Sequence, residues 1–208
     1  MKLLAKKKHI GIAGNIGVGK TTLCEKLSEI FLFKPIYESV IENPYLSDFY
    51  INMERWSFNL QIYFLWHRFS NQIQLEQYNK GFIQDRTIYE DKEIFARNLR
   101  DLGHLSERDW MTYENLFNSM IQFIKEPDLF IYLKASTSTL ISRIENRKRD
   151  FEKNISPEYI HSLNIYYEKW ISKIDKDKLL IIDTNNFNIF KDTDRLDEIV
   201  FLIKEKLK

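Results

Sequence analysis

The sequence has little cysteine, proline or glycine and almost no net charge. Cys24 is the single cysteine, so no disulfide can form within the chain, and we expect a reducing compartment. The formal net charge of +1 argues against a general nucleic-acid-binding protein, which would carry a clear basic excess. No apolar run reaches the roughly 18 residues of a membrane span, and the N-terminal region lacks a signal-peptide pattern. These absences lead us to expect a cytoplasmic protein.

Short apolar runs alternate with longer amphipathic stretches, and no low-complexity segment interrupts them. We therefore expect one domain over residues 1–208. Five runs are almost continuously apolar, as buried parallel strands are: His9–Ala13, Pro35–Tyr37, Phe82–Gln84, Leu129–Leu133 and Leu179–Ile182. Helical patterns lie between them at Thr22–Ile30, Glu54–Tyr78, Trp110–Lys125 and Tyr159–Ile174. This alternation predicts an α/β fold, with a five-stranded parallel sheet flanked by helices.

The strongest pattern is a phosphate-binding loop. It reads Gly14-Asn-Ile-Gly-Val-Gly-Lys-Thr21, a full match to G-x-x-x-x-G-K-[ST], between a predicted strand and a predicted helix. In such a loop the backbone N–H groups and the helix N-terminus attract phosphate. Lys20 is expected to reach the β- and γ-phosphates, and the Thr21 hydroxyl to bind Mg²⁺. We therefore expect ATP to bind at Gly14, Asn15, Ile16, Gly17, Val18, Gly19, Lys20, Thr21 and Thr22.

A phosphate loop identifies a nucleotide but not a reaction. A GTPase would need a guanine-reading N-K-x-D string, but Asn79-Lys80 is followed by Gly81-Phe82. A motor ATPase would usually have an apolar strand that ends in Asp-Glu. The strand at Phe82–Gln84 is instead followed by Asp85-Arg86, and the strand at Leu129–Leu133 by Lys134. A kinase for a small molecule is the class that remains.

Charged residues at predicted strand ends suit phosphoryl transfer. Asp85 and Arg86 follow an apolar strand, at the edge where α/β sheets bind ligands. There an acid can hold Mg²⁺, and an arginine can stabilise charge on the transferred group. Glu38 closes the second strand, where a carboxylate could act as the general base toward a hydroxyl acceptor. Ordinary ion pairs at strand ends are the alternative explanation.

An arginine-rich segment follows the fourth predicted strand. Arg143, Arg147 and Arg149 fall at i, i+4 and i+6, which we expect to lie on a helix. Their side chains predict a lid, near residues 143–155, that closes over the triphosphate. A solvated basic face is the alternative.

Five segments together are more specific than the phosphate loop: Ile12-Ala-Gly-Asn-Ile-Gly-Val-Gly-Lys-Thr21, Glu38-Ser-Val40, Asn43-Pro-Tyr-Leu-Ser-Asp-Phe-Tyr50, Arg55-Trp-Ser-Phe-Asn-Leu-Gln61 and Asp85-Arg-Thr-Ile-Tyr-Glu-Asp91. In these segments the chain resembles the deoxynucleoside kinases, in particular the bacterial deoxyadenosine/deoxyguanosine kinase branch. The resemblance extends from Ile10 to about Leu202. It implies a P-loop kinase fold, ATP with Mg²⁺ as the phosphate donor, and a deoxynucleoside as the acceptor.

The resemblance also implies a role for individual residues. Glu38, Arg86 and Lys20 match the catalytic residues, with Glu38 taking the proton of the 5′-hydroxyl. Thr21 and Asp85 match the residues at the metal. The arginines of the predicted lid match those of the family. The acceptor is expected to contact Glu38, Tyr50, Gln61, Phe64, Arg68, Arg86, Asp91 and Glu152. Among these, Gln61 reads the base edge, Arg68 and Asp91 line the base pocket, and Tyr50 with Glu152 holds the sugar 3′-hydroxyl.

Some residues depart from the family pattern. Asp85 and Thr87 replace a more usual glutamate and serine. Phe64 occupies a position that is small in cytidine-preferring relatives, and Asn43-Pro-Tyr-Leu46 resembles the purine-preferring bacterial branch. Deoxyadenosine is therefore the expected substrate.

The sequence leaves two alternative functions open. A thymidylate-type monophosphate kinase would share the phosphate loop, a D-R string and an arginine lid, although Glu38 would repel an anionic acceptor. A nucleotide-dependent binding or switch protein is the non-enzyme alternative. The family resemblance also implies a homodimer formed through two long helices, for which Glu54–Tyr78 and Trp110–Lys125 are the candidates.

Overall fold

One parallel sheet organises the chain. The computed structural model describes residues 7–37 and 43–208, and within them five strands pair in the order β2-β3-β1-β4-β5. They are β1 (His9–Gly14), β2 (Lys34–Ile36), β3 (Phe82–Asp85), β4 (Leu129–Lys134) and β5 (Leu179–Asp183). All four pairings are parallel. The five predicted strands are confirmed to within one residue at either end.

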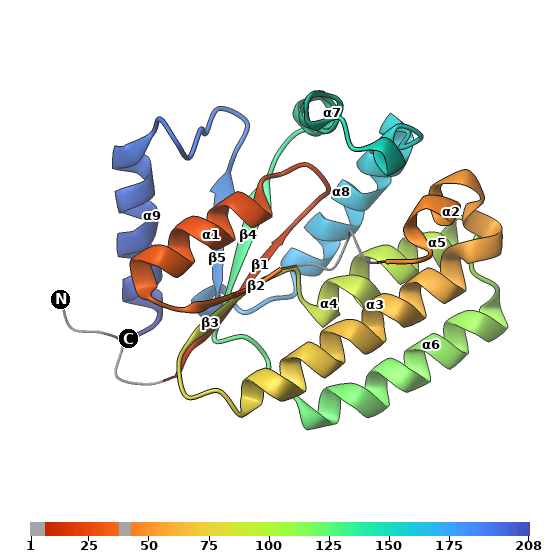
Figure 1. Cartoon of the computed structure of the whole chain (residues 1–208), viewed down its shortest axis with the longest axis horizontal. Helices are drawn as coiled ribbons and strands as arrows, with labels where there is room; N and C mark the ends of the chain where they lie inside the picture. Colours follow the sequence, from red (N-terminus) through yellow and green to blue (C-terminus); the bar gives the residue numbers. More distant parts are fainter. Residues whose placement is uncertain (1–6, 38–42) are drawn as a thin grey trace.

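Helices cover the sheet on both sides. Figure 1 shows α1 (Lys20–Phe31) and α9 (Thr193–Lys206) on one side, with α3 (Met53–Glu76), α4 (Ile88–Glu90) and α8 (Pro157–Ile171) on the other. Every residue of β1 and β3 is buried as a result. Burial on both faces explains why these strands read as nearly continuous apolar runs rather than as alternating ones.

The long helices follow the predicted ranges closely. Side chains cap three of them: Asn52 accepts from Arg55 N at α3, Ser106 from Asp109 N at α6 (Glu107–Met120), and Ser156 from Tyr159 N at α8. The prediction that α6 continues to Lys125 is wrong. The chain tightens into the 3₁₀ turn η2 (Ile121–Phe123) and is extended at Ile124, because it must leave the helix before Pro127 and β4.

Several shorter elements complete the described chain. They are α2 (Leu46–Ile51), α5 (Arg97–Asp101), α7 (Thr137–Arg147) and the 3₁₀ turns η3 (Asp150–Glu152) and η4 (Lys176–Lys178). Between α4 and α5 the helix widens into a π-helical segment, η1 (Asp91–Ala96). Such segments often occur at functional sites, and this one begins at a predicted acceptor residue. None of the helices in the described ranges combines the length and apolar character needed to cross a bilayer.

Two titratable side chains, Cys24 and His9, are buried in the core. Cys24 is fully buried on α1, as expected for a packing residue, and burial raises the pKa of its thiol to about 12. His9 is buried at the start of β1, where its ring stacks on Phe82 with 4.2 Å between centroids. Its Nε2 lies 3.0 Å from Gln84 Oε1. Burial lowers the pKa of His9 from 6.5 to about 3, although the hydrogen bond to Gln84 opposes this shift.

We predict that His9 makes the folded state sensitive to acid. Between about pH 6.5 and 3 the unfolded chain binds a proton at His9 that the folded chain does not, so stability falls as the pH falls through this window. This one group should remove about 2 kcal/mol of unfolding free energy between pH 7 and pH 5. Urea unfolding at both pH values should show a smaller loss for His9→Gln, which retains a donor for Gln84, than for the native chain.

The exposed His161 supplies the matched control, and His161→Gln should lose as much stability as the native chain. An equal loss in His9→Gln would show that His9 is not the group responsible.

Candidate active site

The phosphate loop connects the central strand to the first helix. β1 ends at Gly14 and α1 begins at Lys20, so the loop lies at the carboxyl edge of the sheet. Gly17 and Gly19 have φ values of 83° and 102°, which favour glycine. A Cβ atom on Gly17 would also lie 2.9 Å from Ile144 Cγ1. The sequence of the loop is therefore required by its backbone shape and by the close approach of α7.

The loop opens onto a cavity of about 600 Å³. Six of the nine predicted ATP residues line this cavity: Ile16, Gly17, Gly19, Lys20, Thr21 and Thr22. Lys20 is buried, and its Nζ lies 2.9 Å from Gly14 O and 3.0 Å from Asn15 O. These contacts hold the ammonium group across the loop, beside the cavity that Lys20 lines.

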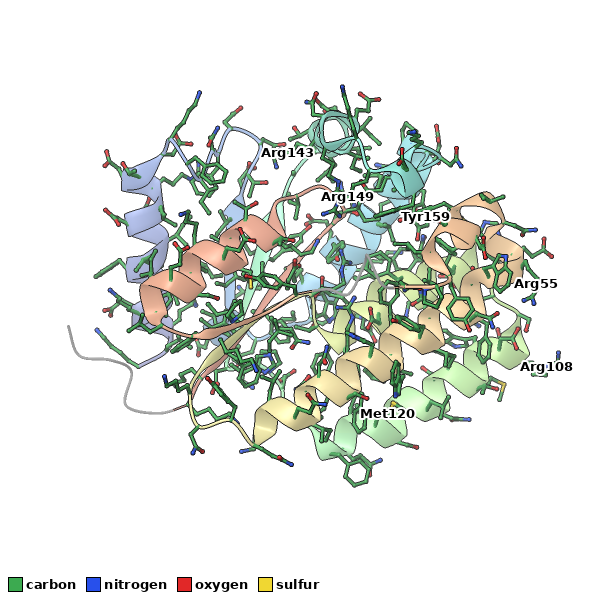
Figure 2. All side chains as sticks on the ribbon, in the orientation of Figure 1. Arg55, Arg108, Met120, Arg143, Arg149 and Tyr159 are labelled. Carbon is green, nitrogen blue, oxygen red and sulfur yellow. The ribbon has the colours of Figure 1, made fainter. Side chains whose placement is uncertain are left out.

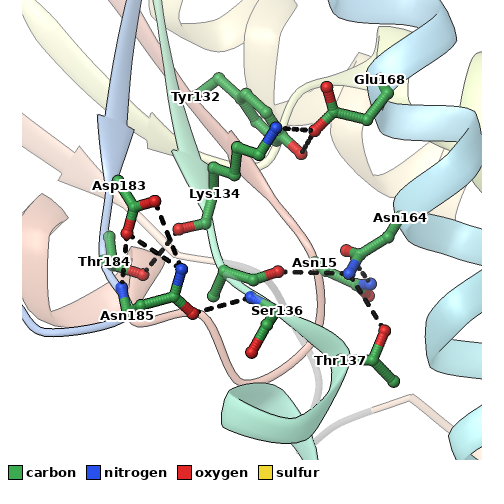
Figure 3. A network of polar contacts seen from close by, with 11 residues as sticks. Asn15, Tyr132, Lys134, Ser136, Thr137, Asn164, Glu168, Asp183, Thr184 and Asn185 are labelled. Atoms are coloured by element: carbon green, nitrogen blue, oxygen red, sulfur yellow. Dashed lines mark hydrogen bonds and ion pairs between the residues drawn. The ribbon is translucent and has the colours of Figure 1, made fainter.

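The other three predicted ATP residues support the loop from beneath. Asn15 donates from Nδ2 to Asn164 Oδ1 at 2.8 Å (Figure 3). It also donates to Ile160 O at 2.9 Å, so the loop is tied to α8. Val18 is buried, and its carbonyl accepts from Arg143 Nη1 at 3.3 Å. Gly14 lies at the end of β1 and uses its carbonyl to hold Lys20.

Thr21 and Asp85 meet where α1 approaches the end of β3. The Thr21 hydroxyl donates to Asp85 Oδ2 at 2.5 Å, and both residues line the cavity. A hydroxyl and a carboxylate are the hard oxygen ligands that suit Mg²⁺. The described residues contain no cluster of three or more potential metal ligands among His, Cys, Asp and Glu. Mg²⁺ usually takes only one or two protein carboxylates, and Asp85 could supply one of them.

Arg86 has an unusual backbone. Its φ of 69° is in the left-handed region, which costs a non-glycine residue about 1 kcal/mol. The buried guanidinium lies over the Phe95 ring, with 4.3 Å from Cζ to the centroid. It also donates to the Tyr167 hydroxyl at 3.0 Å and to Gly14 O at 3.4 Å. The surrounding contacts therefore aim this arginine at the start of the phosphate loop.

The predicted acceptor residues line the same cavity from the opposite side. The described ones are Tyr50, Gln61, Phe64, Arg68, Arg86, Asp91 and Glu152. Glu38 lies outside the described residues, although its neighbour Tyr37 lines the cavity. Donor and acceptor candidates therefore face one shared space.

Two side-chain arrangements define the base side of this cavity. Arg68 Nε donates to Asp91 Oδ2 at 2.6 Å, and its guanidinium lies 5.3 Å from the centroid of the Phe64 ring. Arg68 also donates to Arg86 O at 3.2 Å, so it braces the strained residue. Gln61 is only 2% exposed, and its buried Oε1 accepts no hydrogen bond from a described residue. Such an orphan acceptor inside a cavity suits a polar ligand edge.

The predicted lid is only partly as expected. α7 ends at Arg147 and Lys148 has a φ of 51°, so Arg149 lies beyond the helix and not on a common face with Arg143. Arg147 and Arg149 line the cavity, whereas Arg143 does not. Arg143 instead donates to Val18 O at 3.3 Å and to the Thr184 hydroxyl at 3.2 Å. The left-handed turn at Lys148 is the physical reason for the separation.

Glu152 is held by the lid arginines. Arg147 holds its carboxylate with two charge-assisted hydrogen bonds, one of them 2.6 Å from Nε to Oε2. Arg149 Nη1 lies 3.7 Å from Glu152 Oε1. Glu152 is buried, and these arginines neutralise its charge. Tyr50 and Glu152 both line the cavity, but the dominant partner of Glu152 is the lid.

Sequence reasoning missed several residues of the site. Glu90 and Tyr167 are fully buried beneath the phosphate loop, and Phe95 and Tyr159 line the cavity. Burial raises the pKa of Tyr159, a shift that the positive charge of Arg86 opposes. One signal was available: the capping box Thr87-x-x-Glu90 marks the start of α4. The others depend on contacts between segments distant in sequence.

A second polar network holds the rim of the site. Asn185 Oδ1 accepts from Ser136 N at 2.9 Å, and its amide donates to Asp183 Oδ1 at 3.0 Å (Figure 3). Asn164 donates to Ala135 O at 3.2 Å. The segments after β4 and β5 are thereby tied to each other and to α8, next to the phosphate loop.

Comparison with known proteins agrees with this arrangement. The profile of the family described as deoxynucleoside kinase matches residues 10–208. The chain belongs to the deoxynucleoside kinase family. It is 39% identical to a deoxyadenosine/deoxycytidine kinase of Bacillus subtilis (strain 168), over 95% of this chain and 92% of the relative. It is also 39% identical to a deoxyadenosine kinase of Dictyostelium discoideum, over 92% of this chain and 77% of the relative.

A solved structure shares both the fold and the family. The chain superposes on a deoxyadenosine kinase from M. mycoides, solved with dCMP and dCDP, with a TM-score of 0.85 and 30% identity. The alignment covers 95% of this kinase and 99% of that one. This kinase therefore has the P-loop kinase fold, and its activity is phosphorylation of deoxynucleosides with ATP.

Proposed function

We propose that this kinase transfers the γ-phosphate of ATP to the 5′-hydroxyl of a deoxynucleoside, with deoxyadenosine preferred, and that it does so in the cytoplasm as a single domain over residues 1–208. The observation that carries the proposal is the shared cavity. Lys20 of the phosphate loop, Arg86 at the end of β3, and Gln61 on α3 all line it. A triphosphate and a nucleoside could therefore meet end to end.

The donor side is assigned to the phosphate loop and the lid. The backbone N–H groups of the loop and the Lys20 ammonium would bind the β- and γ-phosphates. Thr21 and Asp85 would hold Mg²⁺, which when bound neutralises phosphate charge. Arg147 and Arg149, from the lid over about residues 143–155, would exchange Glu152 for phosphate oxygens as ATP binds. Arg143 would contribute from the rim, near Thr184.

The acceptor side is assigned to residues on several elements. Glu38 would take the proton of the 5′-hydroxyl as the oxygen bonds to the γ-phosphorus. The bond from that phosphorus to the bridging oxygen then breaks, and ADP leaves with the electron pair. Arg86 would stabilise the charge on the transferred group. Tyr50 and Glu152 would bind the sugar 3′-hydroxyl.

The base is assigned to the pocket of Gln61, Phe64, Arg68 and Asp91. The Gln61 amide can both donate and accept, so it matches the polar edge of adenine, which presents an N–H group beside a ring nitrogen. The ion pair between Arg68 and Asp91 keeps both charges neutralised beside the base. Two relatives at 39% identity carry deoxyadenosine in their names, which supports this choice.

The first experiment is steady-state phosphorylation of the four natural deoxynucleosides by Mg·ATP, with dTMP as a fifth acceptor. We expect the highest kcat/KM with deoxyadenosine, no turnover of dTMP, and loss of all turnover in excess EDTA. Preference for another deoxynucleoside would overturn the base assignment alone. Turnover confined to dTMP would overturn the assignment of Glu38 and favour a monophosphate kinase.

Two substitutions should separate base recognition from chemistry. Gln61→Ala removes hydrogen bonds to the base, so we expect KM for deoxyadenosine to rise by about tenfold or more and discrimination among bases to weaken. Glu38→Gln should lower kcat by about 10²- to 10⁴-fold with little change in KM, because it removes the general base. Kinetics of both variants with deoxyadenosine and deoxycytidine provide the check; the opposite pattern in either variant would refute its assignment.

We also propose that this kinase is a homodimer that pairs through α3 and α6, which lie side by side in Figure 1. Large apolar side chains are exposed there, including Trp66 (53%), Met111 (56%) and Leu116 (40%). Sedimentation velocity should give twice the mass of the chain, and Leu116→Glu should give the mass of one chain. Phe201→Glu, on α9 at the other side of the molecule, should leave the dimer intact. A native monomer would overturn the proposal.

A further inference from the structure

A buried hydrogen-bond network lies beneath the phosphate loop. Its centre is Tyr167 on α8, which is fully buried and surrounded by aromatic rings. The Tyr132 ring stacks on it with 5.6 Å between centroids and an interplanar angle of 17°, and the Trp170 ring meets it at 62°. The ring of Tyr167 is therefore fixed, and so is the direction of its hydroxyl.

The hydroxyl reaches three groups from three different elements. It lies 2.8 Å from Gly14 O, 2.8 Å from Glu90 Oε1 and 3.0 Å from Arg86 Nη1. The arginine donates, whereas the carbonyl and the carboxylate compete for the hydroxyl proton. Burial raises the pKa of Tyr167 well above 10, so the hydroxyl keeps its proton and remains a donor at neutral pH.

Glu90 completes the network from α4. It is fully buried, and its Oε1 accepts from Gly14 N at 3.2 Å as well as from Tyr167. Its Oε2 accepts from Thr87 N at 2.8 Å, which anchors the carboxylate to the backbone that follows Arg86. Both backbone polar groups of Gly14 are therefore held by this pair of side chains.

We propose that Tyr167, supported by Glu90, is a positioning residue that fixes the start of the phosphate loop and the Arg86 guanidinium in one geometry. The inference rests on the role proposed above for Arg86. The donor phosphate is held by the loop, and the reacting oxygen lies on the acceptor side. A hydroxyl that binds both Gly14 and Arg86 sets the distance between the two halves of the reaction. Small errors in such positioning lower the rate of the chemical step more than they lower binding.

The test is Tyr167→Phe, which keeps the ring and removes the hydroxyl. We expect kcat with deoxyadenosine to fall by about 10- to 100-fold, because a displacement of about 1 Å between reacting groups can lower the rate by about 10²-fold. KM for ATP and for the nucleoside should change by less than about threefold, because Tyr167 is fully buried and is not among the residues that line the cavity. The matched control is Tyr132→Phe, which removes a hydroxyl that lies 3.3 Å from Glu168, away from the loop (Figure 3). Its kcat should equal that of the native kinase.

A double-mutant cycle tests whether Tyr167 and Glu90 act through the same contacts, whereas the fall in kcat at unchanged KM is the result that separates positioning from a general loss of structure. If Tyr167 and Glu90 act together, the loss of kcat in Tyr167→Phe/Glu90→Gln should be clearly smaller than the product of the two single losses. The amide resonance of Gly14 in ¹⁵N-labelled protein should shift in both single variants and not in Tyr132→Phe.

The outcomes separate this inference from the proposed function. An unchanged kcat in Tyr167→Phe, or a fall matched by Tyr132→Phe, would overturn the inference, as would multiplicative single effects or an unmoved Gly14 amide. If the native kinase accepted only dTMP, the proposed function would fail, but kcat with dTMP and the Gly14 resonance would still decide the role of Tyr167.

Discussion

Gly14 joins the central strand to the phosphate loop, and the site depends on how its peptide groups are held. Its carbonyl accepts from Lys20, Arg86 and Tyr167, and its N–H donates to Glu90. Few carbonyl groups attract three donors, and here two of them are cationic. The positive charges of Lys20 and Arg86 would otherwise be costly to bury. Here they lie next to the backbone dipole of Gly14, which also binds the buried carboxylate of Glu90.

The acceptor pocket differs from the phosphate site, because its side chains lie on helices rather than on a loop. Gln61, Phe64 and Arg68 project from one side of α3 at helical spacing, and Asp91 begins the π-helical segment that faces them. The ion pair between Arg68 and Asp91 has little access to solvent, so removing one partner would leave an uncompensated buried charge. Loss of either residue should therefore change the base pocket and also weaken the packing of η1 against α3.

Much of this could be predicted from the sequence. The parallel strands were found because burial on both faces produces continuous apolar runs, and the long helices were found because amphipathic stretches lie between those runs. The phosphate loop was recognisable because its glycines are required by backbone shape. Other features had no local signal. The end of α7 at Arg147 depends on a left-handed Lys148, which no pattern of residue types announced. Likewise, the contacts of Tyr167 join residues up to 153 positions apart, so no short window of sequence contains them.

The same separation in sequence has a consequence for biosynthesis. The phosphate loop leaves the ribosome before α8, yet Asn15 is braced by Ile160 and Asn164, and Gly14 by Tyr167. A nascent chain that ended before α8 would carry the full motif without the contacts that shape it. Contacts between such distant segments form late, because closing a long loop is entropically costly. The ability to bind ATP should therefore arise only after α8 has been translated, and chains that lack α8 should not sequester the nucleotide.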